Sequence, residues 1–493
     1  MTPVLFIIIP LASAFLIALV GRKREILSRT LSFLATASLL GLSLVTYFRL
    51  GSGILVTELG GWKMPFGIVL ALDAFGAFML VIVSLIALTS LLFSVSYVRH
   101  LGSDWKYEAL FMILVGGMNG VLITGDLFNL FVFTEIALFA AFALVAYGGQ
   151  AHEFEAAFKY AVMATVSSAL ILMAIAVVYG ATSTLTMAHI SVAMAGIKPG
   201  LKIWIGALFL AGYGLKSALI PFHAWLPDAH SSAPAPISAM LSGVLIKALG
   251  IYVLIRIFFN VLGAPQVFLQ AFLVLGAVSL LVGVFLAVGQ WDLKRLLAYH
   301  SISQVGYIFI GLGLNTALGL AGAVFHLLNH ALFKSLLFYN AGAIEMGLGT
   351  RDLRKMGNIS RLMPVTAHSS MIASLAISGI PPFNGFFSKL MIIIAAVQAH
   401  QPVYALAAVI GSLLTLASFM KVQRYGIRGE SPAKELQSRP GWGMNAAMVI
   451  LAALCLFASL LIIPGIKESV LDPVVAAIMN NTGYAAAVLG AQK

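Results

Sequence analysis

Five ionisable side chains lie in stretches that are otherwise apolar. Glu135 lies within FNLFVFTEIALFAAFALVAY, and Lys216, Lys247, Lys334 and Lys389 have similar surroundings. Burial disfavours the charged form of a lysine, whereas a nearby carboxylate favours it. If Glu135 and Lys216 meet, withdrawal of the carboxylate would let the lysine release its proton, so the pair could act as a proton-transfer switch. The alternative is a static ion pair that holds helices together.

A second pattern is a row of polar residues in AVFHLLNHALFKSLLFYNAGAIE. His326, His330 and Lys334, here called the His–His–Lys ladder, are spaced four apart and so share one helix face. Imidazole donates and accepts protons near neutral pH, so the ladder could conduct them. The alternative is separate polar contacts between helices. Two histidines at this spacing also suit zinc, but no nearby carboxylate or cysteine completes a ligand shell, and we predict no metal site.

Other polar residues lie near the ends or breaks of apolar segments and are candidates for accessory roles. Helix capping at the membrane interface explains each of them equally well. These residues are Asp126, His223, Asp228, His230 and Glu345.

The elements that position these residues must be membrane helices. The chain has 493 residues, of which 61% are hydrophobic and 9% are charged, whereas soluble domains carry about 25% charged residues. A spanning helix needs about 20 apolar residues, and the apolar segments are too continuous for the alternating strands of a barrel. We predict an all-α polytopic membrane protein with about 14 transmembrane helices.

The net charge of +12 indicates topology rather than a nucleic-acid partner. Most of the 29 lysines and arginines follow odd-numbered predicted spans, as in the clusters 22–24, 351–355 and 424–428. Loops rich in Lys and Arg face the cytoplasm, so both termini should face outward. The first span precedes its basic cluster, unlike a cleavable signal, and we expect it to be retained.

Two proline-rich breaks interrupt apolar segments, and each lies close to a lysine. The first contains Pro221 and Pro227, and the second contains Pro381 and Pro382. A proline removes one backbone donor, and the groups it frees need protein or water around them at membrane depth. One such break could be a tolerated kink, but a pair in matching positions is typical of an internal repeat around an ion site. We predict that spans 7 and 12 are broken.

These stretches resemble a known family. GLKSALIPFHAWLPDAH, LLAYHSISQVGY, HLLNHALFKSLLF and SGIPPFNGFFSKL are similar to the antiporter-like membrane subunits of respiratory complex I, membrane-bound hydrogenases and Mrp-type sodium/proton antiporters. The resemblance covers about residues 70–425, and DAHSSAPAPISAMLSG is more similar to the hydrogenase and complex I types. It implies about fourteen helices, two inverted five-helix repeats, broken helices 7 and 12, and a polar axis along the membrane midplane.

The resemblance also implies how the single membrane domain is divided. Residues 1–105 would form an N-terminal three-helix segment, 106–260 the first inverted repeat (helices 4–8), 261–428 the second (helices 9–13), and 429–493 helix 14 with the tail.

The family's relay residues fall on charged positions of this chain. The glutamate of helix 5 falls on Glu135, the lysine of helix 7 on Lys216 and the connecting lysine of helix 8 on Lys247. The polar row of helix 11 falls on the His–His–Lys ladder. The outward-relay lysine of helix 12 falls on Lys389, where some relatives carry glutamate. The resemblance makes Lys389 the exit, although physical reasoning alone would also allow an entrance.

We therefore expect an ion-translocating subunit of a redox-driven complex, such as a membrane-bound hydrogenase or a complex I relative, that moves protons or exchanges sodium for protons. One alternative is a subunit of a multi-subunit Mrp-type sodium/proton antiporter without redox partners. Another is a structural scaffold whose charges merely pair. We expect the chain in a prokaryotic cell (inner) membrane.

The expected partners are other membrane subunits, including further antiporter-like subunits and redox subunits carrying Fe–S clusters, with lipid around them and no nucleic acid. Cys455 is the one cysteine, which cannot ligate such a cluster, and the sequence has no GxGxxG or P-loop signature. We expect no cofactor in this chain. Its part in an enzyme would be that of a non-redox pumping subunit of an oxidoreductase complex.

Overall fold

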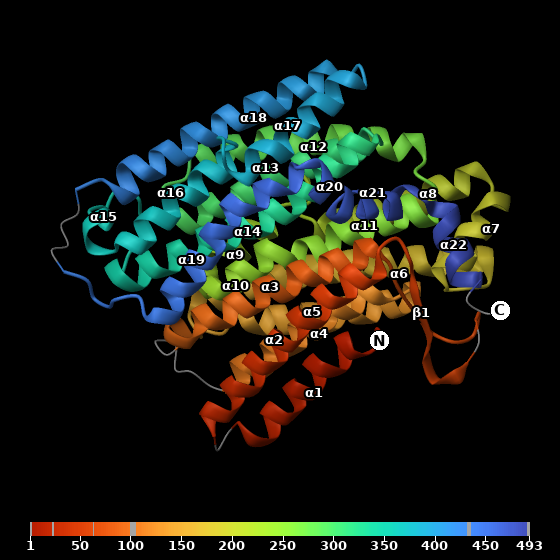
Figure 1. Ribbon diagram of the computed structural model, residues 1–493, viewed down its shortest axis with the longest axis horizontal. Helices are drawn as coiled ribbons and strands as arrows, with labels where there is room; N and C mark the ends of the chain where they lie inside the picture. The colour runs from red at the N-terminus through yellow and green to blue at the C-terminus, as the bar shows by residue number, and fades with distance from the viewer. Residues whose placement is uncertain (1, 22–23, 63, 99–104, 431–434, 491–493) are drawn as a thin grey trace.

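The computed structural model describes residues 2–21, 24–62, 64–98, 105–430 and 435–490. Two residues of the first basic cluster, Arg22 and Lys23, lie outside the described residues. Long helices run side by side, with α1 and α2 at one edge of the molecule and α18 at the opposite edge (Figure 1). The long α14 lies between them, in contact with α3, α10, α13, α16, α17 and α19.

The N-terminal part contains the one sheet among the described residues. Its elements are α1 (Leu5–Val20), α2 (Glu25–Leu50), β1 (Leu55–Glu58), the 3-10 turn η1 (Leu59–Gly61), β2 (Val69–Leu72) and α3 (Ala74–Tyr97). The strands pair antiparallel, with Leu55 opposite Leu72 and Glu58 opposite Val69. The prediction of an all-α chain missed this hairpin, because four-residue apolar strands cannot be distinguished from helix ends by periodicity.

The next stretch contains the first break. Its helices are α4 (Trp105–Ile123), α5 (Leu127–Val145), α6 (Ala151–Thr182), α7 (Met187–Ala193), the 3-10 turn η3 (Met194–Gly196), α8 (Pro199–Lys216) and α9 (Trp225–Ser232). One continuous helix then covers 235–261, and much of it has the wider i→i+5 hydrogen bonding of a π-helix. Its parts are α10 (Ala235–Met240), η4 (Leu241–Leu245), η5 (Lys247–Tyr252), α11 (Val253–Ile255) and η6 (Arg256–Val261).

The last stretch contains the second break and the C-terminal helices. Its membrane helices are α12 (Gln266–Val288), α13 (Leu293–Gly313), α14 (Ala317–Leu348), α16 (Pro364–Ser378), α17 (Asn384–Gln398), α18 (Pro402–Lys421) with η7 (Val422–Ile427), and α19 (Trp442–Phe457) with η8 (Ala458–Ile462). Shorter helices are α15 (Ile359–Leu362), α20 (Pro464–Val470), α21 (Asp472–Met479) and α22 (Asn481–Gly490).

The structure confirms a polytopic helical fold. Among the described residues, 11 helices are long and apolar enough to cross a membrane, and each coincides with a predicted span. The other three predicted spans fall on α1, which has 16 residues, on α8, and on the broken pair α16–α17.

Both predicted breaks are present. Helix α8 ends at Lys216 and α9 begins at Trp225, and Pro221 is one of the eight residues between them. Helices α16 and α17 are separated by residues 379–383, which include Pro381 and Pro382. At each break a side chain donates to a backbone carbonyl near the end of the preceding helix. Trp225 Nε1 donates to Leu215 O at 3.0 Å, and Lys389 Nζ donates to Ile377 O at 2.7 Å.

An internal repeat is visible in two matching features, each of which combines an aspartate helix cap with an isolated β-bridge. The side chain of Asp126 caps α5 and that of Asp292 caps α13, each accepting a backbone N–H three residues on at 2.8 Å. Asp126 also pairs with Thr186, and Asp292 with Asp352, through isolated β-bridges. Each bridge closes the same 60-residue interval, 126 to 186 and 292 to 352. Helices α6 and α14, which lie within these intervals, have 32 residues each.

The parity of crossings makes the second repeat inverted. Five predicted spans lie between the start of α5 and the start of α13: α5, α6, α8, the 235–261 helix and α12. After an odd number of crossings the chain is on the other side of the membrane. Helix α13 therefore runs opposite to α5, as the predicted fold requires.

The basic loops predict which side of the membrane each end faces. Arg354 has a side chain that is 62% exposed, and Cys455, the one native thiol, is buried. An Arg354→Cys variant should react with an impermeant thiol reagent only from the cytoplasmic side, because Lys- and Arg-rich loops are retained there.

Ser52→Cys is the matched control, since Ser52 is exposed in the loop after α2, on the predicted outer side. It should label only from outside. Outside labelling of the Arg354→Cys variant would reverse the predicted topology.

Candidate functional site

Glu135 of α5 and Lys216 of α8 lie together, as the sequence predicted. Lys216 Nζ is 3.8 Å from Glu135 Oε1, and the two side chains are 3% and 25% exposed, the lysine being the more buried. Ser168 of α6 lies between them: its Oγ donates to Glu135 Oε1 at 2.5 Å and accepts from Lys216 Nζ at 3.1 Å. Three helices thus contribute one hydrogen-bonded chain, and the hydroxyl can relay a proton because it both donates and accepts.

The position of Lys216 follows from the broken helix. As the last residue of α8, it lies at the negative end of the helix dipole, which favours a cation. Trp225 holds the break closed, since its indole donates to Leu215 O and its ring stacks on Tyr160 with centroids 4.3 Å apart. A void of about 10 Å³ beside Lys216 is close to the minimum that holds one water.

Lys247 lies at the start of the π-helical segment η5 and is fully buried. Its Nζ donates to Ser242 O, and Ser242 Oγ lies 2.8 Å from Ser301 Oγ of α13. Residues Leu245, Ile246 and Leu249 from the same helix line the void beside Lys216. The helix of Lys247 therefore forms one wall of the Lys216 site, and it also contacts the second repeat.

The His–His–Lys ladder of α14 is buried throughout, at 0% exposure for each member. His326 Nδ1 lies 3.0 Å from Ser388 Oγ of α17, and Lys334 Nζ donates to Leu297 O of α13. Among the described residues, neither ring nitrogen of His330 has a hydrogen-bond partner. The buried imidazole of His330 is thus available for a proton or a water molecule, in the middle of the ladder.

Lys389 of α17 lies beside the second break. It is 2% exposed, and its Nζ lies 4.6 Å from the ring centroid of Tyr307, in addition to its bond to Ile377 O. The neighbouring Ser388 contacts His326. Helix α17 therefore brings Lys389 to the end of the ladder.

The buried lysines differ in their counter-charges. Among the ion pairs of the described residues, Lys216 has a carboxylate partner, while Lys247, Lys334 and Lys389 have none. Lys247, Lys334 and His330 lie within electrostatic range of one another. Several unpaired charges cannot share a buried site without a large desolvation penalty. The charge state of one lysine must therefore influence that of the next.

The accessory candidates have distinct positions. Asp126 caps α5, as capping predicted. Asp228 of α9 forms ion pairs with Lys159 of α6 at 3.2 Å and with Arg295 of α13 at 2.8 Å, so it joins the two repeats. His223 is half-buried in the first break. Glu345 of α14 pairs with Lys294 at 2.8 Å, and His230 of α9 is fully buried.

Sequence reasoning missed a buried ion pair between the N-terminus of α3 and the C-terminal part of the 235–261 helix. Arg256 is 2% exposed and donates to both oxygens of Asp73, at 2.6 and 2.8 Å. Asp73 caps α3 as well, by accepting the backbone N–H of Gly76 at 2.9 Å. Hydropathy could not reveal the pair, because both residues lie at the ends of apolar segments.

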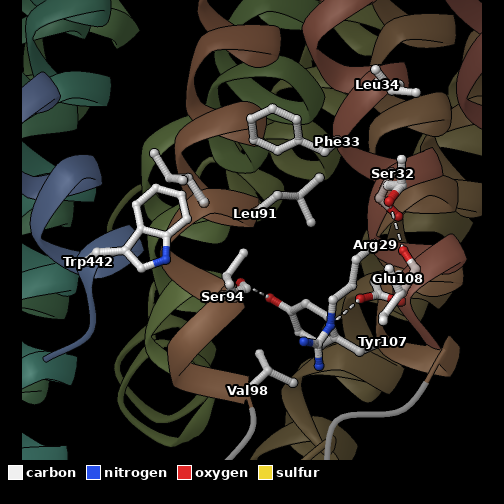
Figure 2. A pocket seen from close by; sticks show the side chains of 14 residues that line it. Arg29, Ser32, Phe33, Leu34, Leu91, Ser94, Val98, Tyr107, Glu108 and Trp442 are labelled. Carbon is white, nitrogen blue, oxygen red and sulfur yellow. Dashed lines mark hydrogen bonds and ion pairs between the residues drawn. The ribbon is translucent and has the colours of Figure 1, made fainter.

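A lateral cavity of about 440 Å³ lies between α2, α3, α4 and α19. Figure 2 shows Trp442 on one side of it, and Arg29 with Glu108 on the other. Its lining contains none of the predicted relay residues. The relay residues instead lie inside packed helices.

Comparisons with known proteins agree with this architecture. The profile of the family described as NADH:quinone oxidoreductase/Mrp antiporter, TM, matches residues 124–415. The chain is 35% identical to a Na(+)/H(+) antiporter subunit of Alkalihalophilus pseudofirmus, over 88% of this chain and 89% of that one. It is 34% identical to a subunit of the NADH-quinone oxidoreductase of Desulforudis audaxviator, over 85% of each.

Two solved structures have the same fold over 99% of both chains. One belongs to the Mrp complex of a Dietzia species, with a TM-score of 0.90 and 29% identity. The other belongs to the membrane-bound sulfane sulfur reductase, an archaeal respiratory membrane complex, with a TM-score of 0.90 and 30% identity. The profile match, the identities and the shared broken-helix fold lead to one conclusion: this chain is an antiporter-like membrane protein of the NADH:quinone oxidoreductase/Mrp antiporter family.

Proposed function

We propose that this chain translocates protons, or exchanges sodium for protons, as a subunit of a multi-subunit membrane complex. The observation that carries the proposal is the Glu135–Ser168–Lys216 chain at a helix break, followed by three buried lysines without carboxylate partners among the described ion pairs. A scaffold would gain nothing from such lysines, because burying them unpaired is costly. A relay needs groups that gain and lose a proton readily.

The relay begins with the paired state, in which Glu135 stabilises the ammonium of Lys216 through Ser168. When the carboxylate withdraws, the neutral form of Lys216 becomes favoured and its proton passes towards Lys247. Arrival of that proton at Lys247 disfavours the charged form of Lys334, so Lys334 passes the proton that it already holds along the ladder. Lys389 would release it on the outer side, in keeping with the exit role that the family resemblance implies.

The proposed setting is a redox-driven complex in the prokaryotic cell membrane, with both termini outside. Electron transfer would take place in partner subunits with Fe–S clusters, and this chain would carry no cofactor. The similarity to an NADH-quinone oxidoreductase subunit and to the sulfane sulfur reductase complex supports this setting. The domain division at 105, 260 and 428 is part of the same proposal.

An antiporter complex without redox partners is the second candidate. It is favoured by the 35% identity to a Na(+)/H(+) antiporter subunit and by the fold of the Mrp complex. Purification of the intact complex in mild detergent, with identification of its components by mass spectrometry, separates the two. Co-purifying Fe–S proteins support the redox setting, and a complex of antiporter subunits alone contradicts it.

Removal of either charge of the pair should stop transport. Lys216→Met and Glu135→Gln should each lower ion translocation by about 100-fold or more, since a positioned proton-transfer group contributes this much. Translocation is measured in vesicles containing the intact complex, and assembly is measured by the recovery of its subunits.

Lys198→Met is the control, because Lys198 is exposed just before α8 begins. The substitution is the same, but it lies outside the relay. It should transport normally. If the Lys216 and Glu135 variants also assemble and transport normally, the switch pair is not part of the pathway.

Ser168 should matter as a bridge rather than as a charge. Losing a hydrogen bond to a charged group costs roughly 1.5–3 kcal/mol, so Ser168→Ala should slow translocation by about 10-fold or more. Ser168→Thr, which keeps the hydroxyl, should restore it. Thr165→Ala is the control, because its hydroxyl is exposed on the same helix and bonds to Ala161 O. Equal rates for Ser168→Ala and the wild type would exclude the bridge.

A further inference from the structure

A second cluster of charges lies where the broken segment meets the loop ends of α13 and α14. Lys294 Nζ is 2.8 Å from Glu345 Oε2, and Arg351 contacts the other oxygen of Glu345 at 3.6 Å. Arg351 Nε also lies 3.0 Å from Asp292 Oδ2. The basic loops place this end on the cytoplasmic side.

The two members of the Glu345–Lys294 pair face different environments. The side chain of Glu345 is 31% exposed, whereas that of Lys294 is 3% exposed. Lys294 lies in the first turn of α13. The other groups near Glu345 are Tyr97 of α3 and His152 of α6. The carboxylate therefore meets solution, and its partner is enclosed by protein.

On its inner side, Lys294 contacts the turn that carries His230. Its Nζ donates to Ala233 O at 3.2 Å, and Ser238 Oγ donates to both His230 O and Ala233 O, at 2.8 and 3.0 Å. His230 is fully buried, and neither of its ring nitrogens has a partner in the part of the chain that the structure describes. This imidazole thus lies behind Lys294 with both nitrogens available.

His230 in turn lies next to the buried lysines. Its ring is 6.1 Å from that of Phe338, and Lys334 Nζ is 5.4 Å from the same ring. His230 also lies within electrostatic range of Lys247 and Lys334. The backbone turn from His230 to Ala233 therefore links the Glu345–Lys294 pair to an imidazole that lies close to the buried lysines.

We propose that Glu345 and Lys294 form the gate through which protons pass between the solution and the buried relay, with His230 as the next carrier. The assignment rests on the proposed function. In one cycle, Glu345 takes a proton from water, and Lys294 gives one of its ammonium protons to His230 through an intervening water. Glu345 then returns its proton to the neutral Lys294. The net change is one proton moved from solution to His230, and the ion pair is restored.

The competing explanation is a purely structural clamp between α13 and α14. The two explanations differ when both charges are removed together. An uncharged pair leaves no buried lone charge, so a clamp replaced by Gln and Met of similar size should still hold the helices. A gate without ionisable groups cannot pass protons.

The test compares Glu345→Gln with the double variant Glu345→Gln/Lys294→Met in the intact complex in vesicles. Both should assemble, and both should lose at least nine-tenths of ion translocation, on the order of the loss of one proton-transfer group. Glu155→Gln is the matched control, because Glu155 is 65% exposed on α6 and pairs with Lys159 at 2.6 Å. The control should keep its full rate. Glu345→Asp, which retains the carboxyl group, should recover transport.

Each outcome decides the assignment. Normal translocation by the double variant shows a clamp and overturns the gate, as does failure of the double variant to assemble, which makes the pair an assembly element. Lys216→Met is measured alongside to separate the two proposals. If it abolishes transport while the double variant does not, the relay stands and the gate is wrong; if neither has an effect, the proposed function fails.

Discussion

The structure depends on one constraint: a backbone group at membrane depth must have a hydrogen-bond partner. A broken helix violates this constraint unless a side chain takes the freed carbonyl. At the first break Leu215 O accepts from both the indole of Trp225 and the backbone N–H of Ala218, and at the second Ile377 O accepts from the ammonium of Lys389 itself. The second lysine is thus part of the break that surrounds it, whereas Lys216 is left free to bind Ser168 and Glu135.

The two repeats share a backbone arrangement but carry different residue types at equivalent positions. The offset that carries Asp126 onto Asp292 also carries Ser168 onto Lys334 and Glu135 onto Ser301. In the first half these two positions hold the hydroxyl of Ser168 and the carboxylate of Glu135, beside Lys216. In the second half they hold an ammonium and a hydroxyl, and Ser301 contacts Ser242 on the helix of Lys247. The acid thus lies on α5 in the first half and the base on α14 in the second, and the equivalent positions on α13 and α6 hold the hydroxyls of Ser301 and Ser168.

The features that depend on hydrophobic periodicity and on charge could be predicted from the sequence. Long apolar segments indicated the spans, paired prolines indicated the breaks, and lone charges indicated that Glu135 and Lys216 should meet. It could not reveal Ser168, because a serine in an apolar helix is common and its partners come from other helices. It could not show that Arg256 and Lys294 are buried and paired, since a charge at the end of an apolar run is compatible with a loop or a buried ion pair. The π-helical turns around Lys247 leave no signature in composition.

The 235–261 helix is enclosed by protein over the whole of its most apolar stretch. Lipid therefore has no contact with the segment that carries Lys247, and a proton there has no sideways route into the bilayer. The efficiency of an ion-translocating protein depends on how slowly ions leak back through it as well as on its rate of transport. The complete enclosure of this helix separates Lys247 from the bilayer and so limits uncoupled leakage of ions through this subunit.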